Sequence, residues 1–179
     1  MPIVPDDKDW TWVLDRPCPE CGLDAATLPR ELLPARIRAD SHAWVSVLAA
    51  PNVGVRPADD TWSALEYACH VRDVDRVYAG RVSRMLSEDD PHYENWDQDA
   101  TAVADRYRDS NPAEVAAELS AAGEALAALF AGVSGPGWQR TGRRSDGASF
   151  TVDSIGRYYL HDIEHHLWDV TGSLPTHER

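Results

Sequence analysis

Two histidines near the end of the chain have the spacing of metal ligands. His161 and His165 lie in a stretch, residues 158–170, that contains no proline or glycine and whose apolar residues recur at three and four positions. This periodicity predicts a helix, on which residues four apart lie one turn apart on the same face. The two imidazoles therefore offer half of a metal site, and another part of the chain must supply a third ligand.

His70 is the candidate for that third ligand. A second helix is predicted over about residues 62–86, capped by Asp60 or Thr61, and His70 falls on the edge of its apolar stripe. A buried imidazole without a partner is costly, so we expect His70 to meet His161 and His165. Three neutral imidazoles would leave a coordination position open, as in catalytic sites. Zn²⁺ is the first expectation, and Ni²⁺, Fe²⁺ or Mn²⁺ would suit the same ligands.

Several neighbouring side chains could support chemistry at such a site. Asp162 is expected to accept a hydrogen bond from the far nitrogen of a ligand histidine. Tyr158, Glu66 and Asp73 are candidates for the general base by proximity alone. His166 projects among the apolar residues of its helix, which favours a packed or hydrogen-bonded core histidine.

Cys18 and Cys21 form the only C-x-x-C pair, and the odd count of three cysteines argues against a disulfide framework. The pair allows three interpretations: an ordinary structural role, half of a zinc site, or a redox pair. A zinc site would need Cys69 or His42 to complete it. The βαβ unit that usually surrounds a redox C-x-x-C is not predicted here.

A basic, turn-rich segment interrupts the acidic sequence at residues 138–150 and could form a small hairpin. Its Arg140, Arg143 and Arg144 either pair with surface carboxylates or clamp an anionic substrate. Trp96 lies in a long acidic connection, residues 87–109, of the kind that often lines a pocket. It could contact substrate or simply pack as part of a lid.

The charge of the chain limits its partners. The formal net charge is −13, from 17 basic and 30 acidic residues among 179. So negative a surface disfavours nucleic acids and anionic membranes as partners. A small-molecule substrate is expected from the metal site, whose ion would activate a water or thiol for attack on it. The N-terminus lacks the basic start and apolar segment of a secretory signal, so we expect a cytoplasmic protein.

Helical periodicity and capping residues predict four long helices. The first begins between Pro29 and Pro34, the second covers about 62–86, the third begins at Pro112, and the fourth follows Thr151 and ends near Gly172. This pattern predicts an all-α four-helix bundle with long connections. We expect an irregular N-terminal segment over residues 1–28, a bundle over 29–172 and a frayed tail over 173–179.

The surroundings of His70, residues 62–73, followed about ninety residues later by His161-x-x-x-His165-His166, resemble the DinB/YfiT superfamily. The resemblance covers roughly residues 30–172 and implies a four-helix bundle with metal ligands His70, His161 and His165. It also implies a homodimer that acts as a metal-dependent hydrolase or as a thiol S-transferase using bacillithiol, mycothiol or glutathione. Mycothiol-dependent maleylpyruvate isomerases are similar but tend to have Glu where this chain has His161, which is a departure from the isomerase pattern.

Two rival interpretations fit the same residues. One is a non-enzymatic metal-binding or stress-response protein. The other is a structural dimer in which hydrogen bonds satisfy the histidines.

Overall fold

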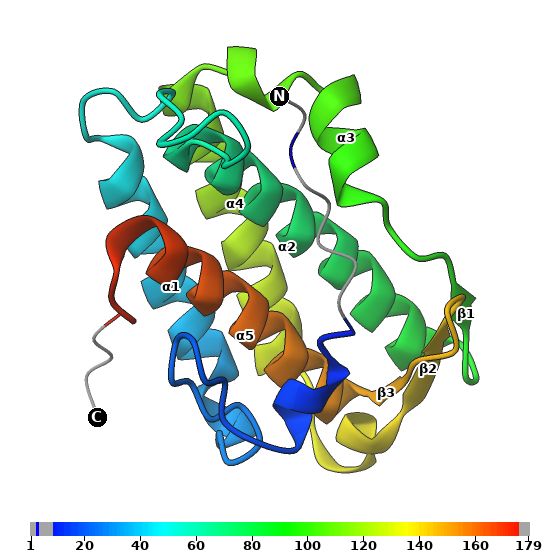
Figure 1. The fold of residues 1–179 in the computed structure, drawn as a ribbon. Coiled ribbons are helices and arrows are strands. Elements are labelled where there is room, and N and C mark those ends of the chain that lie inside the picture. The colour runs from blue at the N-terminus through cyan, green and yellow to red at the C-terminus, as the bar shows by residue number, and fades with distance from the viewer. Residues whose placement is uncertain (1–2, 4–8, 176–179) are drawn as a thin grey trace.

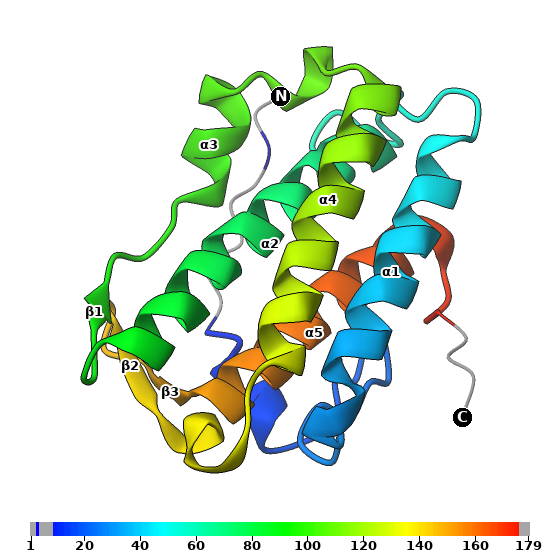
Figure 2. The ribbon, with the colours of Figure 1, turned by 180° about the vertical axis from the view of Figure 1, so that it is seen from behind.

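The computed structural model describes residues 3 and 9–175. Its long helices are α1 (Leu33–Leu48), α2 (Ala64–Ser87), α4 (Pro112–Ala131) and α5 (Val152–Thr171), with a short α3 (Gln98–Ala104). Helix α4 packs against both α1 and α2, and α5 packs against the same two helices from the opposite side (Figures 1 and 2). The predicted all-α bundle is therefore confirmed, and the four predicted helices lie within a few residues of their expected bounds.

Helices α2 and α5 both begin at capping boxes. Ser63, rather than the expected Asp60 or Thr61, accepts the Glu66 backbone N–H, and the Glu66 carboxylate accepts the Ser63 N–H. Thr151 and Ser154 make the equivalent pair at α5, which ends at Gly172 with a φ of 72°. Both ends of α5 are therefore specified locally, which matters because α5 carries most of the candidate ligands.

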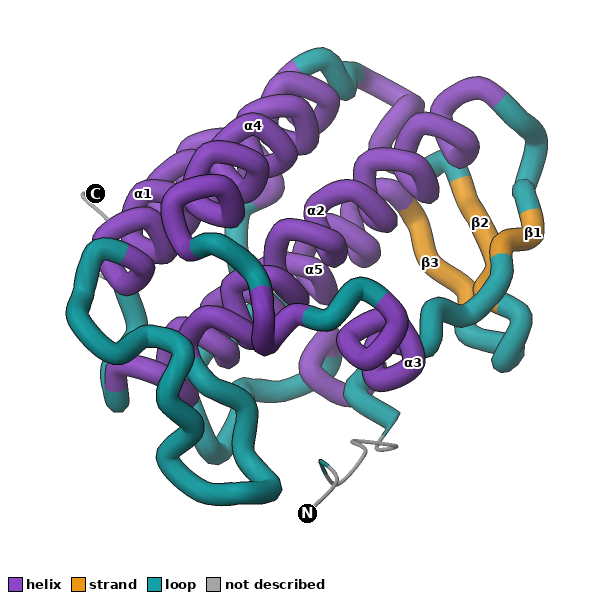
Figure 3. The backbone as a smooth tube through the Cα atoms, turned by 90° about the horizontal axis from the view of Figure 1, so that it is seen from above, coloured by secondary structure: helices purple, strands orange, loops and turns teal. Residues whose placement is uncertain are grey.

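A small sheet closes one end of the bundle. Its strands β1 (His92–Tyr93), β2 (Thr141–Arg144) and β3 (Ser149–Thr151) lie in the order β1-β2-β3, with β1 parallel to β2 and β2 antiparallel to β3. The β2–β3 pair is the small hairpin considered from the sequence. Figure 3 shows the three strands beside the ends of α2 and α5. The sheet thus joins the connection after α2 to the residues that lead into α5.

The N-terminal segment crosses α5 and has a small core of its own. After a 3₁₀ helix, η1 (Thr11–Leu14), the chain forms turns beside α5 (Figure 1). Cys18, Cys21 and Leu23 are buried there. The partly buried side chains packed on them are Trp10, Trp12, Trp168 and Leu174. The segment is irregular, as expected, but it is docked through specific side chains.

Two further expectations concern the ends of the chain. Residues 1–2, 4–8 and 176–179, which include most of the predicted tail, lie outside the described residues. Within the described part of the chain, none of the helices has the length and apolar character that crossing a membrane requires.

Candidate metal centres

Helix α5 contributes a pair of candidate ligands to each of two clusters. The second pair, Asp162 and His166, follows the first, His161 and His165, by one residue. The aspartate cluster consists of His70, Asp162 and His166, and the cysteine cluster consists of Cys18, Cys21, His161 and His165. Within each cluster, one candidate ligand atom per residue lies within 4.8 Å of all the others. Successive residues of a helix project about 100° apart, so the two i,i+4 pairs of α5 face different neighbours.

The aspartate cluster joins α5 to α2. The rings of His70 and His166 lie 4.9 Å apart between centroids and meet edge-on. His166 Nε2 lies 3.1 Å from the Asp162 carboxylate, and His166 Nδ1 lies 3.1 Å from Asp169. Trp96 stacks on the His70 ring, with centroids 5.4 Å apart and planes 7° apart. Each imidazole is therefore fixed by neighbours that limit its rotation.

Burial and neighbouring charges shift the pKa values of the two histidines of this cluster in opposite directions. Burial lowers the pKa of His70 to about 3, so its imidazole is neutral at pH 7. Burial also opposes the charge of His166, but the hydrogen bonds and negative charges of Asp162 and Asp169 raise its pKa to about 9. Asp162 responds in the opposite direction, since its partner His166 outweighs burial and lowers the carboxyl pKa to about 2.

His70 has an unusual deficit of partners. Its side chain is only 1% exposed, and neither Nδ1 nor Nε2 has a hydrogen-bond partner among the described residues. Leaving buried polar nitrogens unsatisfied costs on the order of 1–3 kcal/mol for each group. A cation bound between His70, Asp162 and His166 would remove part of that cost, so these residues fit a metal.

A wide cleft of about 1,210 Å³ borders the aspartate cluster. Asp162, His166 and Asp169 line it, whereas His70 is buried and is not part of its wall. The edges of His161 and His165 also reach the cleft wall. Aromatic and basic side chains form much of the remaining wall, among them Trp10, Trp62, Tyr67, Trp96, Arg81, Arg144 and Tyr158. A ligand in the cleft would therefore reach the Asp162 and His166 side of the cluster.

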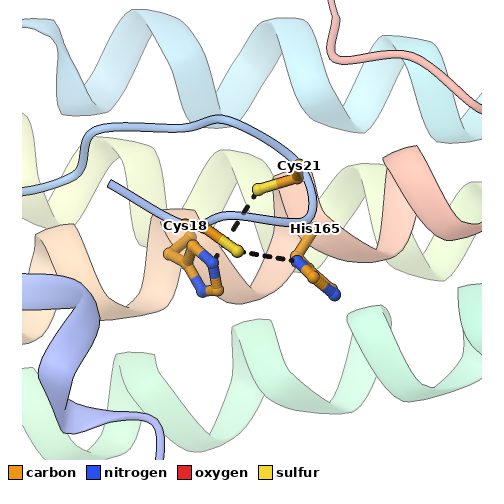
Figure 4. Close-up of side chains that lie close together, drawn as sticks. Cys18, Cys21 and His165 are labelled. Atoms are coloured by element: carbon orange, nitrogen blue, oxygen red, sulfur yellow. Dashed lines mark hydrogen bonds between the residues drawn. The ribbon is translucent and has the colours of Figure 1, made fainter. Parts of the chain in front are cut away.

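The cysteine cluster joins α5 to the N-terminal segment. Cys18 Sγ lies 3.7 Å from His165 Nδ1, and Cys21 Sγ lies 3.9 Å from His161 Nε2. Figure 4 shows Cys18 and Cys21 on one loop, both turned towards α5, with Cys18 facing His165. All four side chains of the cluster are buried, and all three cysteines of the chain are free thiols.

This grouping differs from the set expected from the sequence. His70 was expected to meet His161 and His165, but the structure places it with the following residues of α5, Asp162 and His166. The reason is the rotation of α5 about its axis, which turns the 162/166 pair towards α2 and the 161/165 pair towards the N-terminal segment. Asp162 accordingly sits among the candidate ligands. His166 is hydrogen-bonded, one of the two roles expected for it, but to two carboxylates at the cleft rather than inside the apolar core.

The three candidates for the general base are placed differently. Tyr158 lines the cleft. Glu66 is paired with Arg56 at 2.5 Å, and Asp73 is paired with Arg72 at 2.8 Å, and neither lines the cleft. Both carboxylates therefore have structural partners, which leaves Tyr158 as the candidate that a substrate in the cleft could reach.

The three arginines of the predicted basic clamp do not act together. Arg140 donates to the backbone carbonyls of Met85 and Glu88 at the end of α2, and Arg143 pairs with Asp90 at 2.6 Å. Only Arg144 of the three lines the cleft, where it is held by Asp146 at 2.8 Å. The predicted position of Trp96 at the rim agrees with its place in the cleft wall, where it also stacks on His70.

Comparisons with known proteins place this chain in a family. A model of the DinB superfamily matches residues 35–170, most of the chain. The chain belongs to the DinB superfamily. No curated protein matches it significantly. Among solved structures it is similar to YfiT from Bacillus subtilis, described as a probable metal-dependent hydrolase with an unusual four-helix bundle topology. The two share 18% identity, the match covers 96% of this chain and 91% of that one, and the TM-score is 0.66.

Sequence reasoning did not single out Asp169, although this DinB-superfamily chain uses it at both clusters. Its carboxylate lies 3.1 Å from His166 Nδ1 and 3.7 Å from His165 Nε2. The sequence did contain a signal for Asp169. It is three residues after His166 and four after His165, a spacing that places it beside both histidines on the helix surface.

Proposed function

We propose that this protein is a metal-dependent enzyme whose divalent cation is held by His70, Asp162 and His166 beside the cleft. The observation that carries this proposal is the buried His70 ring, which has two unpartnered nitrogens and faces two further candidate ligands from α5. A purely structural histidine in the core would be expected to have a hydrogen-bond partner.

The donor set supports a catalytic rather than a closed structural site. Two imidazoles and one carboxylate are a common set for Zn²⁺ with a coordination position left open, and Ni²⁺, Fe²⁺ and Mn²⁺ accept the same ligands. When bound, such a cation would polarise a substrate oxygen or lower the pKa of a bound water or thiol. Asp162 and His166 line the cleft, so the open position would face a small molecule there.

The residues of the chain would orient the ligands and the substrate. Asp169 accepts the Nδ1 proton of His166. A cation would replace the proton that Nε2 shares with Asp162, so that Nε2 could serve as the ligand atom. Arg144 and Tyr158 lie together in the cleft and would bind an anionic group of the substrate, such as a carboxylate. Burial raises the pKa of Tyr158 above its ordinary value, so its hydroxyl is a proton donor at neutral pH.

We infer a hydrolase or a low-molecular-weight-thiol S-transferase, two activities that differ in whether water or a thiol attacks. The description of YfiT as a probable metal-dependent hydrolase supports the first. A mycothiol-dependent isomerase is a second candidate. By the resemblance these isomerases tend to have Glu at the position of His161, four residues before a ligand histidine, and here Asp162 stands four residues before His166. A homodimer, implied by the resemblance, and a cytoplasmic location are also part of this proposal.

Metal analysis and activity together test the proposal. The purified protein should contain a divalent cation that is lost in His70→Ala and in His166→Ala. A panel of esters and amides, and of electrophiles with mycothiol, bacillithiol or glutathione, should show turnover that a chelator abolishes and added metal restores. His42→Ala is the matched control, since His42 belongs to neither cluster, and it should keep full metal content and activity.

Turnover that is unchanged after complete removal of the metal would contradict the proposal. Metal binding without any turnover across the panel would favour a metal-binding or stress-response protein. A protein that binds no cation at His70 and whose stability is unchanged in His70→Ala would favour the structural-dimer interpretation.

A further inference from the structure

We propose that the cysteine cluster is a second, structural zinc site, in which Cys18, Cys21, His161 and His165 bind one Zn²⁺ and fasten the N-terminal segment to α5. This site is distinct from the cation proposed at His70. It lies mainly outside the region matched by the family model, because both cysteines precede residue 35.

The distances between donors fit a tetrahedral ion. With Zn–S bonds of about 2.3 Å and Zn–N bonds of about 2.0–2.1 Å, tetrahedral geometry separates sulfur from nitrogen by about 3.6 Å. The separations are 3.7 Å for Cys18 Sγ to His165 Nδ1 and 3.9 Å for Cys21 Sγ to His161 Nε2. Both values lie within a few tenths of an ångström of what the ion requires.

The local backbone turns both sulfurs to the same side. The Cys18 N–H donates to the Leu23 carbonyl at 2.9 Å, and the Gly22 N–H donates to the Cys18 carbonyl at 2.9 Å. Gly22 has a φ of 79°, in the left-handed region that favours glycine. The sequence Cys-Pro-Glu-Cys-Gly therefore forms a tight turn closed by its own hydrogen bonds, with the two thiols directed at α5 (Figure 4).

Neighbouring side chains prepare the histidines for this role. Glu20 lies 3.4 Å from His165 Nε2, so a proton on Nε2 would leave the Nδ1 lone pair facing Cys18. The Trp10 ring covers both imidazoles, with centroids 5.5 Å from His161 and 5.2 Å from His165. The four ligand residues are 1–8% exposed. A site with four protein ligands and little access to water is typical of structural zinc.

The alternative is a redox or nucleophilic thiol pair. Reactive cysteines sit in partly exposed positions, whereas these two are buried under Trp10 and Trp12. Each also faces the nitrogen of a different imidazole, which a disulfide between them would not use. The zinc interpretation accounts for all four side chains, and it explains how an irregular segment can form one wall of the cleft through Trp10 and Glu20.

Cobalt substitution distinguishes this site from the proposed catalytic one. Co²⁺ bound by thiolates shows a sulfur-to-metal charge-transfer absorption that Co²⁺ bound only by nitrogen and oxygen lacks. We expect this absorption in the Co²⁺-loaded protein, its loss in Cys18→Ser/Cys21→Ser, and its retention in His70→Ala. Cys69→Ser is the matched control, because Cys69 is equally buried but contacts the Tyr107 carbonyl instead, and it should keep the full signal.

Zinc content and thiol reactivity give independent readouts. The protein should hold two ions per chain, one lost in the double serine variant and the other in His70→Ala. Alkylation of Cys18 and Cys21 should be at least tenfold slower with Zn²⁺ than after chelation, a measurement that requires no variant to fold. The proposal is overturned if the charge-transfer absorption is absent, if alkylation is insensitive to metal, or if intact mass shows a Cys18–Cys21 disulfide. None of these results would remove an ion bound at His70.

Discussion

Asp169 is the residue on which the two clusters meet. Its carboxylate accepts the His166 Nδ1 proton at 3.1 Å and lies 3.7 Å from His165 Nε2. A carboxylate that accepts the far proton of a ligand histidine fixes its tautomer and strengthens its donor nitrogen. The position of one acidic side chain therefore influences how well each cluster can bind an ion.

We expect Asp169→Asn to lower the affinity of the proposed catalytic site for its cation by roughly 10- to 100-fold, because an amide orients His166 less strongly. Titration of the metal-depleted protein with Zn²⁺ against a competing chelator measures this change. Asp153→Asn is the control, since Asp153 is on the same helix but pairs with Arg157. An unchanged affinity in Asp169→Asn would show that His166 does not depend on this hydrogen bond.

Helix α5 carries four of the seven residues of the two clusters, so its start and its rotation matter most. Its N-terminus is fixed by the reciprocal pair of Thr151 and Ser154, and its rotation by buried contacts. At Gly156, a β-carbon would lie 2.6 Å from Leu33 Cδ1 and 3.0 Å from Phe130 Cε1. This close approach holds α5 against the bundle at one angle.

Thr151→Ala should destabilise the protein by about 1 kcal/mol, since the first turn of α5 loses the oxygen that accepts the Ser154 N–H. The free energy of unfolding from urea denaturation measures the loss. Thr151→Ser keeps the hydroxyl and should retain most of the stability. If alanine and serine were equivalent, the capping hydrogen bond would contribute nothing measurable.

The sequence could not predict the rotation of α5 about its axis. Periodicity and capping residues predicted the long helices, and the last one carried the predicted ligand pair His161 and His165 with Asp162 and His166 beside it. Choosing between the 161/165 and 162/166 pairs required knowing which face turns to α2. One clue was present, because His166 projected on the same side as Ile155, Tyr159 and Ile163, which are buried. The cysteine cluster was out of reach, since Cys18 and His165 are 147 residues apart.

At the level of the whole molecule, a buried carboxyl links stability to pH. Asp75 is 1% exposed on α2 and accepts a 2.6 Å hydrogen bond from the Tyr159 hydroxyl on α5. Burial outweighs this bond and raises the Asp75 pKa from 3.8 to about 7. The folded protein therefore holds a proton that the unfolded chain releases, so the contribution of Asp75 to stability is full below pH 4 and is lost as pH rises through 7.

We expect Asp75→Asn to flatten the stability profile between pH 5 and pH 8. Between pH 5 and pH 8, the free energy of unfolding of the natural protein should fall by on the order of 2 kcal/mol more than that of the variant, because the neutral amide never ionises. Urea denaturation at both pH values measures this difference. Asp60→Asn, a change at an exposed carboxylate, should leave the profile unchanged. If Asp75→Asn changed the free energy of unfolding by the same amount at both pH values, the Asp75 carboxyl would not be the source of the pH dependence.

The ring contacts of the two clusters also give the molecule its own optical reporters. Trp96 stacks on His70, and Trp10 lies over His161 and His165. A paramagnetic ion such as Cu²⁺ or Co²⁺ quenches the emission of an indole that it approaches closely. Filling either site should therefore quench the fluorescence of one tryptophan more than that of the other six, and Trp96→Phe or Trp10→Phe would reveal which site fills first.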